Sequence, residues 1–113
     1  MIKLKELELK EIGELVEISH QVGVEDGAML NKQELLIKIL RAYVDKNEEL
    51  STTGILDVIN DGYGFLRKNG QWQSVGDVYV SQSQIRRFGL RTGDEITGQV
   101  RPPKDSERYF GLI

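Results

Sequence analysis

The spacing of apolar residues changes once along this chain, and that change limits the folds that the chain can adopt. Between Leu4 and Val44 the apolar residues recur at helical intervals, which is typical of amphipathic helices. After Thr52 they alternate with polar residues or glycine in short segments bounded by turn residues. The sequence therefore predicts an α+β protein, with a helical subdomain over residues 1–50 and a β domain over residues 51–113.

The first part is expected to be a small bundle of two or three helices. The stretch "EIGELVEIS" predicts a helix that ends near Gly23, and a short turn around Leu4–Leu7 precedes it. The stretch "NKQELLIKILRAYV" predicts the next helix. Asn31 can cap this helix, and Glu34 stands at the distance that a capping box requires. We expect this acidic part to brace the β domain and to add some nucleic-acid or partner surface.

The second part contains five short segments rich in β-branched and aromatic residues. These are "TGILDVIND", "GYGFLRK", "DVYVS", "DEITGQV" and "RYFGLI". Between the third and the fourth, "SQSQIRRFGL" predicts one helical turn, with Ser81 or Ser83 as its cap. Five strands in about sixty residues indicate a small closed or nearly closed barrel, and the oligonucleotide-binding (OB) fold fits best. We expect the helical bundle to pack on this five-stranded, cold-shock-like OB barrel.

The alternation in these strands leaves aromatic side chains on the outer face of the barrel. In "GYGFLR", Tyr63, Phe65 and Arg67 share one side of a strand, while the leucine takes the core side. Tyr79 and Tyr109 face outward for the same reason, because their neighbours are better placed to fill the core. These neighbours are Val78 and Val80 in one segment and Phe110 and Leu112 in the other. Exposed apolar clusters usually mark contact surfaces. The alternative for these rings is burial beneath the helical part.

Single-stranded nucleic acid is the partner that best suits a row of outward rings. A ring stacked on a base contributes roughly 1–3 kcal/mol. Rings two residues apart on a strand lie about 7 Å apart, a spacing that splayed nucleotides can match. Arginine and lysine side chains of this half can contact phosphates, while Asp77 and Glu107 can accept the exocyclic amine of cytosine. A protein-docking surface built from the same rings is the alternative from a different functional class.

Composition and charge weigh against several other functions. A net charge of −3 argues against binding nucleic acid by bulk charge. The excess negative charge lies in residues 1–50, which carry seven Lys/Arg and eleven Asp/Glu. The chain has no cysteine, one histidine, no G-x-x-x-x-G-K-[ST] phosphate loop and no nucleophile–base pair. We therefore expect neither enzymatic activity nor a metal or cofactor in this chain. No signal peptide or membrane-length apolar run is present, so a cytoplasmic location without membrane contact is expected.

Several motifs together resemble one bacterial family. "GYGFLR" resembles the aromatic ribonucleoprotein motif of cold-shock barrels. The run that begins "GILDVINDGYGFLR" and contains "SQIRRFGLRTGD" and "RPPKDSERYF" is more specific. It is similar to the N-terminal RNA-binding domain of the Rho transcription termination factors. The helical part, with "NKQELLIKIL", resembles the SAP-like subdomain that precedes the barrel in that family.

The resemblance covers nearly the entire chain and implies a function and a set of site residues. It implies the primary RNA site of an ATP-driven RNA translocase that is a homohexamer at full length, prefers cytosine-rich transcripts and also admits single-stranded DNA. ATP and magnesium are then expected only beyond this chain, which alone is expected to be a monomer. The implied RNA-binding residues are Ile59, Tyr63, Phe65, Arg67, Asp77, Tyr79, Lys104, Glu107, Arg108 and Tyr109.

Two positions depart from the family pattern. The first of the paired stacking rings is commonly phenylalanine, and Tyr63 keeps the flat face while adding a hydroxyl. The loop "KNGQWQSVG" differs more strongly, and Trp72 within it is assigned no role.

Overall fold

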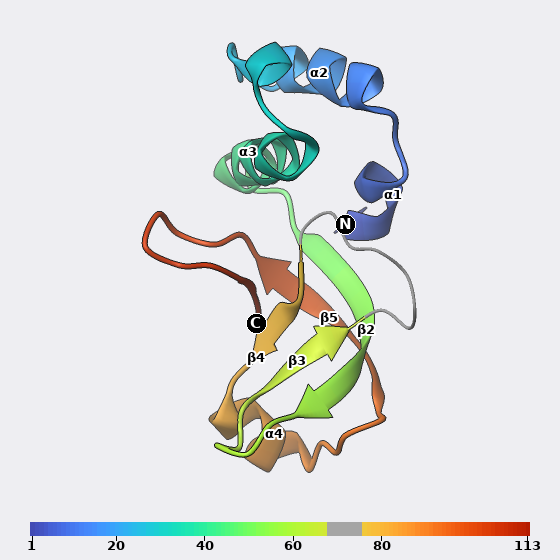
Figure 1. Cartoon of the computed structure of the whole chain (residues 1–113), viewed down its shortest axis with the longest axis vertical. Coiled ribbons are helices and arrows are strands. Elements are labelled where there is room, and N and C mark those ends of the chain that lie inside the picture. Colours follow the sequence, from blue (N-terminus) through green and yellow to red (C-terminus); the bar gives the residue numbers. More distant parts are fainter. Residues whose placement is uncertain (68–75) are drawn as a thin grey trace.

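A computed structural model describes residues 1–67 and 76–113, and it places a helical part next to a β-barrel (Figure 1). Trp72 lies outside the described residues. In chain order the elements are β1 (Ile2–Lys3), α1 (Leu4–Glu8), α2 (Ile12–Gln21), the 3₁₀ helix η1 (Gly27–Met29), α3 (Lys32–Asp45), β2 (Leu50–Val58), β3 (Gly64–Arg67), β4 (Val78–Val80), α4 (Gln82–Phe88), β5 (Glu95–Arg101) and β6 (Phe110–Leu112).

Aliphatic side chains on the facing sides of α2 and α3 hold the helical part together. The fully buried members are Leu15 on α2 and Leu35, Leu36, Ile39 and Leu40 on α3. At the start of α3 the Asn31 side chain accepts a hydrogen bond from the Glu34 amide, and the Glu34 carboxylate accepts one from the Asn31 amide. The helix therefore begins with the capping box that the sequence predicts.

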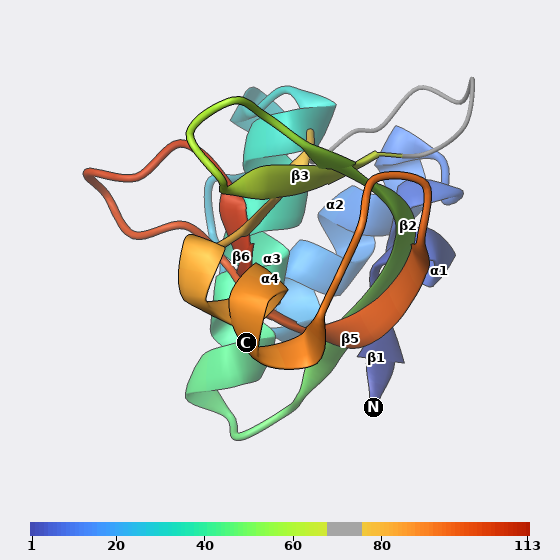
Figure 2. The ribbon, with the colours of Figure 1, turned by 90° about the horizontal axis from the view of Figure 1, so that it is seen from below.

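Strand β2 closes the barrel because it pairs with a neighbour on each side. The strand order is β1-β2-β3-β4-β6-β5, and β2 also pairs with β5. The β4–β6 ladder is parallel, whereas β2–β3, β3–β4, β2–β5 and β5–β6 are antiparallel. The view along the barrel shows the strands curling around a shared interior (Figure 2). The predicted α+β architecture with a five-stranded barrel is confirmed.

Strand β1 is the element that the sequence pattern missed. It pairs in parallel with the start of β2, joining Ile2 to Leu50 and Lys3 to Ser51 in register. Two residues are too few to show an alternation, so only the fold reveals this strand.

The barrel interior is filled by the residues that the alternation assigned to it. Leu66, Val78, Val80 and Phe110 are each at most 2% exposed. Leu112, which was also expected inside, is half-buried and packs against the edge of the core. The opposite faces of these strands are therefore the surface on which the rings lie.

Helix α4 is longer than the single turn that the sequence predicts. Its cap is Ser81, whose hydroxyl accepts a hydrogen bond from the Gln84 amide, and Gly89 ends it in a left-handed conformation at φ 61°. The Gln84 side-chain amide also donates to the Leu112 carbonyl at 2.9 Å, which ties the helix to β6. Figure 1 places α4 at the end of the barrel away from the helical part.

Close packing of β2 on β3 predicts a specific stability defect. A Cβ atom added at Gly64 would lie 2.7 Å from the Asp57 carbonyl oxygen and 3.2 Å from the Val58 Cα atom, both backbone atoms of β2. Gly64→Ala should therefore lower the free energy of unfolding by about 1–3 kcal/mol, the usual cost of overpacking. Urea unfolding followed by circular dichroism would measure it.

Gly13→Ala is the matched control, because nothing lies within 4 Å of a Cβ atom built at Gly13 in α2. Alanine is favoured over glycine in helices by up to about 1 kcal/mol, so this variant should be as stable as the parent chain or more stable. Equal stability of the two variants would contradict the close approach of β2 and β3.

Candidate nucleic-acid interface

Four aromatic rings lie together on the outer face of the barrel, and we call Tyr63, Phe65, Tyr79 and Tyr109 the ring platform. Phe65 on β3 and Tyr79 on β4 are directly paired in the antiparallel ladder. Tyr63 precedes β3, and Tyr109 precedes β6, which pairs with β4. Tyr79 is 38% exposed and the other rings are half-buried. None of them belongs to the buried core.

Phe65 is the centre of the ring platform. Its centroid lies 4.9 Å from that of Tyr109, 5.9 Å from Tyr63 and 6.1 Å from Tyr79, each at an edge-to-face angle. Tyr63 and Tyr79 are 5.6 Å apart with their planes tilted by 39°. Such pairs stabilise one another beyond their buried area. The rings therefore support one another, and each keeps part of its surface accessible.

A tight turn sets the position of Tyr63. The Ile59 amide donates to the Tyr63 carbonyl at 2.8 Å, and the Gly62 amide donates to the Ile59 carbonyl at 2.9 Å. Gly62 has φ 88°, a conformation that glycine adopts without strain. The half-buried Ile59 thus lies at the base of the turn that presents the first ring.

Two carboxylates hold Arg67 against the ring platform. Its guanidinium carbon lies 5.8 Å from the Phe65 centroid, and its Nε atom lies 3.4 Å from Asp57 Oδ2 and 3.8 Å from Asp77 Oδ2. Asp57 was not predicted as part of the site. It lies on β2 directly opposite Phe65, and the sequence alone did not reveal that pairing.

The segment between β5 and β6, residues 102–109, carries four of the predicted residues, and we call it the 102–109 loop. The Glu107 carboxylate accepts two hydrogen bonds from Arg101, at 2.7 and 3.0 Å, and a third from the Lys104 amide at 2.9 Å. The Glu107 amide donates to the Lys104 carbonyl at 2.8 Å. Arg101, which was expected only among the basic residues that can contact phosphates, therefore folds the loop around Glu107. The bonds to Arg101 and Lys104 lower the pKa of Glu107 from its ordinary 4.5 to about 2.

The remaining predicted residues lie beside this arrangement. The Arg108 guanidinium carbon is 5.8 Å from the Tyr109 centroid, and Lys104 is exposed. The structure thus gathers Tyr63, Phe65, Arg67, Asp77, Tyr79, Arg108 and Tyr109 through direct side-chain contacts. Glu107 and Lys104 join them through the loop, and Ile59 through the turn.

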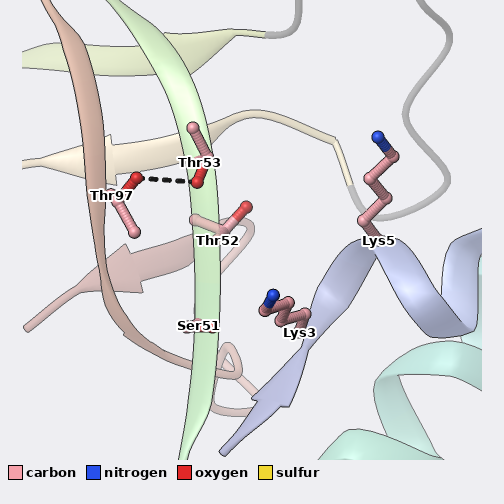
Figure 3. A pocket seen from close by; sticks show the side chains of 6 residues that line it. All are labelled: Lys3, Lys5, Ser51, Thr52, Thr53 and Thr97. Carbon is pink, nitrogen blue, oxygen red and sulfur yellow. Dashed lines mark hydrogen bonds between the residues drawn. The ribbon is translucent and has the colours of Figure 1, made fainter.

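A separate cavity of about 340 Å³ lies over β1, β2 and β5. Its lining residues are Lys3, Lys5, Ser51, Thr52, Thr53 and Thr97, and the hydroxyls of Thr53 and Thr97 are hydrogen-bonded at 2.8 Å (Figure 3). No residue of the ring platform lines it, so it is not part of the predicted interface.

Within residues 1–67 and 76–113, no three or more His, Asp or Glu side chains gather in a way that could hold a metal ion. No helix among the described residues is long and apolar enough to cross a membrane.

The fold and the outer rings define a class: an OB-like barrel preceded by a small helical domain. Comparison with known families makes this specific. Residues 52–113 match the family described as "Rho termination factor, RNA-binding domain", and residues 6–48 match "Rho termination factor, N-terminal domain". The chain therefore belongs to the Rho termination factor RNA-binding domain family.

Similarity to individual relatives extends over nearly the whole chain. The chain is 46% identical to transcription termination factor Rho of Pseudomonas aeruginosa, 44% identical to that of Pseudomonas fluorescens and 42% identical to that of Escherichia coli K12. Each match covers 99% of this chain and 27% of the relative. The chain thus spans about a quarter of the length of these relatives, in their RNA-binding region rather than their ATPase region.

The lowered pKa of Glu107 predicts a local response to acid. A carboxyl group whose pKa falls on folding stabilises the folded loop above its ordinary pKa of 4.5, and this contribution is lost as the pH falls toward about 2. A carboxyl NMR titration should therefore give Glu107 a midpoint near 2, and Arg101→Met should move it toward 4.5. The pKa of Asp26, which Lys38 lowers, should stay unchanged in that variant. If the titration midpoint of Glu107 is the same in Arg101→Met as in the parent chain, the pairing is refuted.

Proposed function

We propose that this chain binds single-stranded, pyrimidine-rich RNA with a preference for cytosine, as the primary RNA-binding region of a Rho-type termination factor. The observation that carries the proposal is the ring platform: four mutually supported rings with accessible faces on the outside of an OB-like barrel. The family match supports RNA as the ligand class.

In this proposal Tyr63 and Phe65 stack on successive bases. Their planes are nearly perpendicular, at 79°, so a strand must turn as it passes from one ring to the next. Splayed bases of an unpaired strand can make that turn, whereas the bases of a duplex remain stacked on one another. The arrangement thereby favours single strands, and single-stranded DNA remains a second acceptable ligand.

Recognition of cytosine is assigned to the polar groups around Phe65 and Tyr79. Cytosine offers an exocyclic amine as donor and its O2 and N3 atoms as acceptors. Asp77 can accept from the amine, while Arg67 and Arg108 can donate to the acceptor atoms. Glu107 already accepts three hydrogen bonds, so we assign it to shaping the 102–109 loop around Tyr109 and the exposed Lys104.

The wider role extends this proposal to the longer protein. The names of the relatives support transcription termination as the process in which the chain acts. We propose that residues 1–50 and 51–113 form the two domains of an RNA-capturing module, monomeric alone and cytoplasmic. Hexamer formation and ATP- and magnesium-dependent translocation are assigned to the rest of such a protein.

Removing the central ring should weaken binding strongly. Phe65→Ala removes one stacking face and the contacts to three other rings, so the dissociation constant for a short oligocytidine should rise by the equivalent of about 1–3 kcal/mol. Fluorescence anisotropy of a labelled oligocytidine would measure the loss.

Phe88→Ala is the matched control, because Phe88 is also an exposed ring, 66% accessible, with an arginine 5.6 Å from its centroid. It lies on α4, outside the ring platform. Binding should be unchanged by this variant. Equal losses in both variants would reject the ring platform as the binding surface.

Base preference and salt dependence separate RNA binding from a protein-docking role for the same rings. The parent chain should bind oligocytidine more tightly than oligoadenosine, and Asp77→Ala should narrow that difference because the amine loses its acceptor. If about two phosphates are neutralised, log affinity should fall with log salt concentration at a slope near −1.4. Equal affinity for both oligomers, with no salt dependence, would favour protein docking.

A further inference from the structure

Arg41 of α3 reaches from the helical part to the barrel. Its Nε and Nη2 atoms donate to the Pro103 carbonyl at 3.0 and 2.5 Å, and its Nη1 atom donates to Asp105 Oδ1 at 3.2 Å. Arg41 and these two partners are more than sixty residues apart in sequence. One side chain thus binds the 102–109 loop at two of its residues.

The surroundings of Arg41 show why these bonds matter for the loop. A groove of about 500 Å³ lies between α3 and the loop, lined by Arg41, Val44 and Asp45 on one side and by Arg101 and Pro102 to Asp105 on the other. Pro102 and Pro103 are buried, whereas Lys104 and Asp105 on the same side of the groove are exposed. The planar guanidinium bridges the groove with paired hydrogen bonds, a geometry that a single lysine ammonium does not reproduce.

The two bonds of Arg41 differ in their surroundings. The Asp105 side chain is fully exposed, so this ion pair is screened by water and weak. The Pro103 carbonyl receives its bonds in a part-buried position, where a charged donor forms a stronger hydrogen bond. The contact with Pro103 therefore dominates.

The anchored loop leads directly to the ring platform. Lys104 follows Pro103, and the Lys104 amide donates a hydrogen bond to the Glu107 carboxylate. The same carboxylate accepts a hydrogen bond from Arg101. Arg108 and Tyr109 come next, and the Tyr109 ring is the nearest partner of Phe65 at 4.9 Å. Arg41 thus fixes one end of the loop and Arg101 its middle, so that the loop enters β6 with Tyr109 against Phe65.

We propose that Arg41 is a positioning residue for RNA: it contacts no base, but it holds the 102–109 loop in the conformation that completes the ring platform. This inference rests on the proposed RNA-binding function and gives the helical part a specific task in it. If the loop adopts the binding-competent conformation only part of the time, the apparent affinity for RNA is reduced in proportion to the fraction of time spent in that conformation.

The variant Arg41→Met tests the proposal, with Lys38→Met as its matched control. Lys38 lies one turn earlier on α3, has the same charge, and pairs with Asp26 within the helical part. In the absence of RNA, Arg41→Met should lower the heteronuclear NOE of the amides of residues 104–108, while Lys38→Met should leave them unchanged. Arg41→Gln provides a second variant if Arg41→Met melts at a lower temperature than the parent chain.

Binding measurements complete the test. Arg41→Met should raise the dissociation constant for oligocytidine about three- to tenfold and narrow the preference over oligoadenosine, with the salt slope unchanged. Asp105→Asn should change affinity less than twofold, because only the exposed ion pair is lost.

Three outcomes overturn the proposal in distinguishable ways. A parent chain that fails to bind oligocytidine rejects the proposed function itself, whatever the loop amides report. A looser loop with unchanged affinity and preference rejects the positioning role while leaving RNA binding intact. If the slope of log affinity against log salt concentration becomes less steep by about 0.7 in Arg41→Met, Arg41 instead contacts a phosphate directly.

Discussion

The pairing of β2 with neighbours on both sides is the constraint on which the rest of this structure depends. Residues Ile55–Val58 of this strand pair with β3 and residues Leu50–Ile55 pair with β5, which turns a short sheet into a closed barrel. Closure sends one set of alternating side chains inward and the other set outward. Gly54 and Gly64 permit the close approach of β2 and β3, because an added Cβ atom would lie 2.9 Å from the Leu66 Cβ atom at Gly54 and 2.7 Å from the Asp57 carbonyl oxygen at Gly64. The ring platform is the outer half of that same alternation.

Much of this arrangement was predictable because its causes are local in sequence. The inward positions of Leu66, Val78, Val80 and Phe110 follow from a period of two. The capping box at Asn31 follows from two side chains three residues apart, whereas for the later helix the sequence left the cap open between Ser81 and Ser83, and the structure shows Ser81. The outward placement of Tyr63, Phe65 and Tyr79 comes from the same alternation, so the rings could be selected before any coordinates were known.

The parts that could not be predicted depend on contacts between distant segments. Asp57 joins the site only because β2 pairs with β3 in one register. Arg101 was expected as a phosphate contact, but its pairing with Glu107 across a loop was not. The bonds of Arg41 to the 102–109 loop connect residues whose separation in sequence gives no local signal. Strand β1 is too short to carry a pattern. Periodicity selects a face of each element, but it does not reveal which faces meet.

The pairing of arginines with carboxylates at this surface has a consequence for competing polyanions. Arg67 lies near Asp57 and Asp77, and Arg101 pairs with Glu107, so both of these cations are already compensated. A rigid double helix is captured mainly by uncompensated positive charge, and residues 51–113 carry only eight Lys/Arg against seven Asp/Glu. Under the proposed function, this charge compensation would add to the geometry of the rings in disfavouring duplex DNA.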